Sequence, residues 1–143
     1  MVRLRIWAYN PLKNNIGHAS LEVGELNRPG YRYMSVWPAQ GANKGRSVTK
    51  KYDFEQEDGD CWYQVTYSNL DEAKMLKYWD YLNNNNSLTY ADTMYGFNCM
   101  TNAALFLIVG KNLDPIEDVW QIMTIQEHWS LMWFSKGMKW GGW

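Results

Sequence analysis

The first part of the chain alternates apolar and polar residues, a pattern typical of strands with one buried face. Three segments show it, residues 2–9, 17–23 and 31–37. Because successive side chains of a strand point to opposite sides, the second segment places His18, Ser20 and Glu22 together on the face opposite the core. The turn sequence at residues 27–30 predicts that the second and third strands form an antiparallel hairpin, which Pro38 ends.

The middle of the chain has a weaker pattern. Residues 39–60 are mostly polar and show no sustained period, so we expect a loop beside a cleft, with short strand character around 48–54. Residues 61–67 alternate again and predict a strand. Ser68 or Asn69 then caps a helix.

The most apolar helix of the chain is expected to begin around Cys99. Asn98 is a favourable N-cap, and the apolar run that follows closes at Gly110. A further helix start is predicted at Asp114, where a proline and a glutamate follow at the positions that favour one. The tryptophan-rich tail from residue 128 onward has no assigned element.

These elements predict an α+β fold, in which a small, mostly antiparallel sheet packs against the Cys99 helix and one or two further helices. A chain of 143 residues fits a single domain, residues 1–143.

With 14 Lys and Arg against 15 Asp and Glu, the chain has no excess of positive charge that would favour binding to nucleic acid. It also lacks an apolar run that could span a membrane and the features of a signal peptide. We expect a cytoplasmic protein, or one exported without a cleaved signal.

Cysteine usage and motifs argue against metal or cofactor chemistry. Cys61 and Cys99 are too few for a disulfide framework or a metal cluster, and there is no Gly-rich phosphate loop. We therefore expect no cofactor and no metal. The aromatic content is 16%, with 9 Trp and 10 Tyr, and such side chains either fill a core or line a ligand cleft.

Cys99 is the candidate nucleophile. It lies in the first turn of its helix, where free backbone N–H groups and the helix dipole favour a thiolate. The backbone N–H of the same residue could also stabilise an oxyanion. The alternative is a small buried cysteine without chemistry, since free cysteines are among the most buried residues.

A cysteine nucleophile needs a base, and the chain has two histidines, His18 and His128. His18 lies on the strand face opposite the core, directly after Gly17, and is the better candidate. His128 is surrounded in sequence by large apolar residues, as in a core or an interface. It stays open as an alternative.

The residue that orients His18 is left between two candidates. Glu22 shares its face but lies about 13 Å away along the strand. Ser35 on the neighbouring strand is a candidate orienter, and Asp53 from the long loop is the alternative. The acidic cluster that follows Asp53 is expected to be a solvated loop; it comprises Glu55, Glu57, Asp58 and Asp60. Four residues that flank these candidates are expected to contact substrate, namely Tyr33, Trp37, Tyr95 and Asn98.

Three segments together resemble a known superfamily. They are GHASLEV at 17–23, YMSVWP at 33–38 and YGFNC at 95–99, the last opening an apolar helix. This layout resembles the circularly permuted papain-like cysteine hydrolases and acyltransferases, which include permuted NlpC-type enzymes, the lecithin:retinol acyltransferase group and the PPPDE peptidases. It also looks like bacterial effector and toxin versions of that fold. The resemblance implies Cys99 as nucleophile and His18 as base, and it does not supply the third residue.

The resulting expectation is a cysteine hydrolase that cleaves a peptide, isopeptide or peptidoglycan amide bond through an acyl-enzyme on Cys99. The first alternative is an acyltransferase of the same fold that passes an acyl group to a protein or lipid. The second, of another class, is an inactive binding or inhibitory module. The expected partners are a protein, peptide or acyl-group substrate and, for a toxin, a cognate inhibitor protein.

Overall fold

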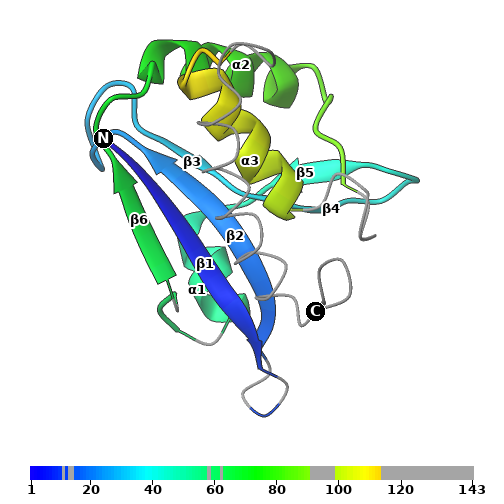
Figure 1. Cartoon of the computed structure of the whole chain (residues 1–143). Helices are drawn as coiled ribbons and strands as arrows, with labels where there is room; N and C mark the ends of the chain where they lie inside the picture. Colours follow the sequence, from blue (N-terminus) through cyan, green and yellow to red (C-terminus); the bar gives the residue numbers. More distant parts are fainter. Residues whose placement is uncertain (11, 13–14, 58, 62, 91–98, 114–143) are drawn as a thin grey trace.

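The computed structural model describes residues 1–10, 12, 15–57, 59–61, 63–90 and 99–113 (Figure 1). Its elements follow the order β1 (Val2–Asn10), β2 (Asn15–Val23), β3 (Arg32–Met34), β4 (Val36–Pro38), β5 (Gly45–Ser47), α1 (Lys50–Gln56), β6 (Tyr63–Tyr67), α2 (Glu72–Asn84) and α3 (Cys99–Gly110). The expected α+β class is confirmed, with a small antiparallel sheet packed against helices.

The main sheet has four strands in the order β3-β2-β1-β6, all antiparallel. The long β1–β2 hairpin forms its centre, in a register that sets Trp7 opposite His18. The expected third strand, 31–37, is split at Ser35. Its first part, β3, pairs with β2 as predicted, whereas β4 pairs with β5 in a separate two-stranded sheet. Ser35 therefore lies at the point where the chain leaves one sheet for the other.

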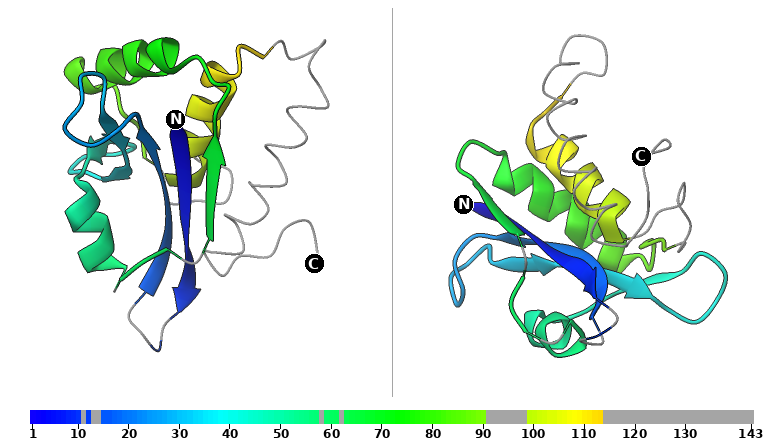
Figure 2. Two further views of the ribbon diagram at one scale, coloured as in Figure 1. Left: turned by 90° about the vertical axis from the view of Figure 1, so that its left-hand side faces the viewer. Right: turned by 60° about the horizontal axis from the view of Figure 1, so that its bottom comes forward.

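The two faces of the main sheet differ in chemistry. One face is apolar and packs against α2 and α3, which lie together on that side (Figure 2). Its core consists of side chains that are almost fully buried, including Leu4, Ile6, Leu21, Met75, Phe106 and Leu107. Apolar burial on this scale is the main source of stability in a domain of this size.

The opposite face is polar and is covered by α1 (Figure 2). The expectation of strand character around 48–54 is wrong, because residues 50–56 form this helix and Thr49 is its N-cap. The side chain of Thr49 caps α1 by accepting a hydrogen bond from the backbone N–H of Tyr52, at 3.2 Å. The residues buried on this side are Asp53 of α1 and Glu57, the C-cap residue of α1, rather than apolar residues. A helix that buries carboxylates gives no hydrophobic period to detect.

The remaining helices follow the sequence closely. α3 runs from Cys99 to Gly110 as expected, and α2 is capped by Asp71 instead of Ser68 or Asn69. None of the helices in the described part of the chain is long and apolar enough to cross a bilayer. The helix expected at Asp114 and the tail from residue 128 lie outside the described residues.

Candidate functional site

His18 is the centre of the polar face. Its side chain is 2% exposed and lies between two indole rings, with ring-centroid distances of 4.9 Å to Trp37 and 5.8 Å to Trp7. Gly17, directly before it, has φ of 78°, a left-handed conformation that glycine adopts without strain. The backbone at Gly17 and the two tryptophans thus fix the position of the imidazole.

Both candidate orienters contact the same nitrogen of this ring. The Nε2 atom lies 2.7 Å from the Ser35 hydroxyl oxygen and 3.2 Å from Asp53 Oδ1. The choice between Ser35 and Asp53, left open by the sequence, is therefore not exclusive in the structure. With Nε2 engaged on this side, Nδ1 is the ring nitrogen left for a nucleophile.

Asp53 is fully buried and held by several donors. Its Oδ1 accepts the Trp37 indole N–H at 2.6 Å, and its Oδ2 accepts the Tyr33 hydroxyl at 2.7 Å. Burial disfavours the charged carboxylate, but the hydrogen bonds from His18 and Tyr33 outweigh it and hold the pKa of Asp53 below its ordinary value. Asp53 is thus a buried anion beside the imidazole.

Tyr33 continues this network to β2. Its hydroxyl lies 2.8 Å from the hydroxyl oxygen of Ser20, which shares the face of His18. Burial and the Asp53 charge raise the pKa of Tyr33, so it stays a neutral donor. Tyr33 and Trp37 therefore hold Asp53 in place. That they also contact substrate stays a prediction.

Cys99 is the first residue of α3, and its side chain is buried. Its charge and its hydrogen bond act directly on the imidazole of His18. Burial lowers the pKa of His18, but Cys99 and Asp53 outweigh that effect and raise the pKa from 6.5 to about 9. Both partners therefore favour the protonated form of His18.

One other candidate, Glu22, can be placed. Glu22 takes no part in orienting His18, because its Oε1 accepts bonds from Arg3 at 2.9 Å and Arg5 at 3.0 Å. Burial opposes its charge, but the bonds from Arg5 and from Lys50 lower the pKa of Glu22 to about 2. Three further candidates lie outside the described residues, namely Tyr95, Asn98 and His128.

Glu57 is buried beside His18's strand, although the sequence pattern did not indicate it. The acidic cluster was expected to be solvated, and Glu55 and Asp60 are exposed, but Glu57 is 1% exposed. Its Oε2 accepts the backbone N–H of Gly17 at 3.0 Å. The spacing of four residues between Asp53 and Glu57 is the signal that could have found it, because residues four apart share one face of a helix.

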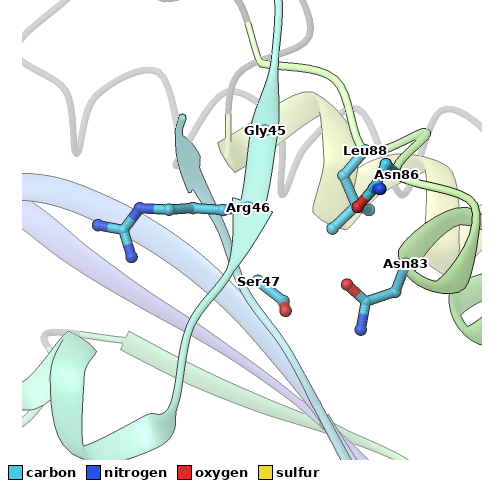
Figure 3. Close-up of a pocket in the computed structure, with 6 residues that line it drawn as sticks. All are labelled: Gly45, Arg46, Ser47, Asn83, Asn86 and Leu88. Carbon is cyan, nitrogen blue, oxygen red and sulfur yellow. The ribbon is translucent and has the colours of Figure 1, made fainter. Parts of the chain in front are cut away.

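A separate hollow lies at the end of α2 and is lined by Gly45, Arg46, Ser47, Asn83, Asn86 and Leu88. Its volume is about 230 Å³. Figure 3 shows Ser47 and Asn83 on one side of β5, whereas Arg46 points to the other side. Trp37, next to His18, pairs with Arg46 and so shares the Arg46 side. The hollow is therefore not part of the histidine site.

Neither a metal site in the described residues nor a match to a known protein indicates the chemistry. Within the described residues, no group of three or more His, Cys, Asp and Glu side chains could hold a metal ion. No protein-family model, no curated protein and no solved structure matches this chain. The geometry around His18 thus carries the functional argument alone.

Proposed function

We propose that the protein is a cysteine hydrolase that cleaves an amide bond, of the peptide, isopeptide or peptidoglycan type, through an acyl-enzyme on Cys99. The observation that carries the proposal is the buried imidazole of His18, held on Nε2 by Asp53 and Ser35 and paired with Cys99. Nucleophile, base and orienting group are the parts that cysteine-dependent acyl transfer needs. The order of a histidine strand before a cysteine helix supports a permuted papain-like arrangement.

The chemistry follows from the protonation states. The Cys99 thiolate attacks the carbonyl carbon, and a C–S bond forms as the carbonyl electrons move to oxygen. Collapse of this intermediate breaks the C–N bond, and protonated His18 gives its proton to the leaving amine. Neutral His18 then takes a proton from water, which attacks the acyl carbon and releases the acid and the thiolate.

Asp53 and Ser35 keep the imidazole in one orientation through these steps. Since both contact Nε2, the ring cannot turn without losing a bond to a buried carboxylate. The negative charge of Asp53 also stabilises the imidazolium that must be present before the amine leaves. A histidine with a merely structural role needs neither a buried anion nor a thiol partner.

The test is the pH dependence of iodoacetamide alkylation, followed by peptide mass spectrometry. Cys61 is the internal control, because burial and Asp60 raise the pKa of that thiol. We expect the Cys99 thiolate to form well below the ordinary thiol value of about 8.5. His18→Gln is the matched variant, because a glutamine amide can still donate to Asp53 but offers no base to Cys99. In that variant the Cys99 pKa should rise.

An activated ester supplies the second half of the test. Incubation with p-nitrophenyl acetate should acetylate Cys99 and release nitrophenol in a burst, which His18→Gln should abolish. If Cys99 instead titrates like Cys61 and takes no acetyl group, the hydrolase proposal is wrong, and a binding module is the better description.

A further inference from the structure

Glu57 is a buried carboxylate that the proposed reaction does not use. It is the C-cap residue of α1, four residues after Asp53, and both side chains are almost fully shielded from water. Burying an anion is costly unless hydrogen bonds compensate for the lost water. The bond from the Gly17 N–H to Glu57, at 3.0 Å, provides part of this compensation.

The bond between Gly17 and Glu57 lies at a part of β2 that β3 does not reach. β3 pairs with β2 only at residues 21–23, so strand pairing on that side of β2 stops short of Gly17 and His18. Helix α1 covers this part instead, and it contacts two consecutive residues of β2. Asp53 binds the His18 ring, and Glu57 binds the Gly17 backbone.

The ends of α1 are fastened to the sheet as well. Lys50 forms an ion pair with Glu22 of β2, at 3.1 Å. The Trp7 indole N–H donates to the Gly59 carbonyl, just after the helix, at 3.0 Å. α1 is therefore held along its length, and the two buried carboxylates, Asp53 and Glu57, are fixed relative to the strand that carries His18.

We infer that Glu57 is a positioning residue for His18, which acts by holding the backbone of Gly17 and so setting the distance between the imidazole and Cys99. This inference rests on the proposed function, because it concerns the same base. Gly17 has φ of 78°, and the backbone turns there immediately before the imidazole. A tether on that N–H limits the direction in which the His18 side chain leaves the strand. Small errors in the placement of a catalytic group lower the reaction rate strongly.

Two conservative substitutions distinguish the effect of the hydrogen bond to the Gly17 N–H from the effect of the Glu57 charge. Glu57→Gln keeps the reach of the side chain and an acceptor oxygen but removes the charge. Glu57→Asp keeps the charge but is one methylene shorter, so it withdraws the acceptor from the Gly17 N–H. The matching controls are Glu55→Gln and Glu55→Asp, because Glu55 belongs to the same helix and is exposed.

The readout is the apparent pKa of Cys99 from alkylation, with the midpoint of thermal unfolding measured in parallel. We expect Glu57→Asp to raise the Cys99 pKa by about one unit, which lowers the alkylation rate about tenfold at a pH below both values. Glu57→Gln should shift it clearly less, and both Glu55 variants should match the unsubstituted chain. A general loss of stability would lower the unfolding midpoint without moving this pKa.

The outcomes decide the inference separately from the proposed function. If Glu57→Asp leaves the Cys99 pKa unchanged, or if Glu57→Gln changes that pKa more than Glu57→Asp does, the inferred positioning role of Glu57 is wrong. If Glu57→Asp does not fold, the Glu57→Gln variant alone tests the inference. A rise of one full unit in the Cys99 pKa of that variant would also show that the positioning role of Glu57 is wrong. If Cys99 of the unsubstituted chain titrates as an ordinary thiol, it is the proposed function that fails.

Discussion

Replacing Asp53 by asparagine removes the anion beside His18 and nearly preserves side-chain size. The Asp53 oxygen lies 3.2 Å from Nε2, and both groups are buried. At an effective dielectric constant of about 20, two unit charges at that distance attract by about 5 kcal/mol, which is an upper bound. A hydrogen bond to a charged group has a net value of about 1.5–3 kcal/mol. We therefore expect Asp53→Asn to weaken the imidazolium–thiolate pair by about 2–3 kcal/mol, or about 30- to 160-fold.

The assay is the alkylation rate of Cys99 at pH values below its apparent pKa, where the rate follows the thiolate fraction. Asp60→Asn is the matched control. It should leave Cys99 unchanged and lower the pKa of Cys61, because Asp60 adds to burial in raising that pKa. If Asp53→Asn folds and leaves the Cys99 profile unchanged, Asp53 is not the group that stabilises the protonated base.

Three further predictions follow from other contacts. Glu22→Gln leaves Arg5 without a buried anion and should destabilise the fold by about 3–5 kcal/mol in urea unfolding, against about 0.5 kcal/mol or less for the exposed Glu25→Gln. Because the folded pKa of Glu22 is about 2 and its ordinary value 4.5, this difference should be full above pH 4.5 and vanish as pH falls through 2. The His18 ring should titrate near pH 9 by NMR in the folded chain and near 6.5 in urea, and amide cleavage should decline above pH 9. Gly17→Ala should cost about 1–2 kcal/mol at φ of 78°, and an unchanged unfolding midpoint would contradict that strain.

The sequence predicted the elements whose hydrophobic pattern is regular. β1, β2 and α3 were expected within one or two residues of their bounds, because their core positions recur at the period of a strand or a helix. The break at Ser35 was missed, since alternation continues through it and a pattern does not show which strand is the partner. Pairing depends on contacts between distant segments.

The site was predictable only in part, for a related reason. Cys99 and His18 stood out through their local setting, whereas the choice between Ser35 and Asp53 depended on where α1 packs. That helix was missed because its buried face is acidic. Glu57 was taken for a solvated residue for the same reason, as a one-dimensional pattern treats every charged residue as exposed.

The members of the site are far apart in the chain, and this has a consequence for protein synthesis. On the ribosome, His18, Ser35 and Asp53 are made before Cys99, and the imidazole has no thiol to pair with until α3 exists. Until the helix docks on the sheet, Cys99 is an ordinary, weakly reactive thiol. In the proposed mechanism the reactive thiolate therefore forms only once α3 has packed on the sheet, and the nascent polypeptide does not carry it during translation.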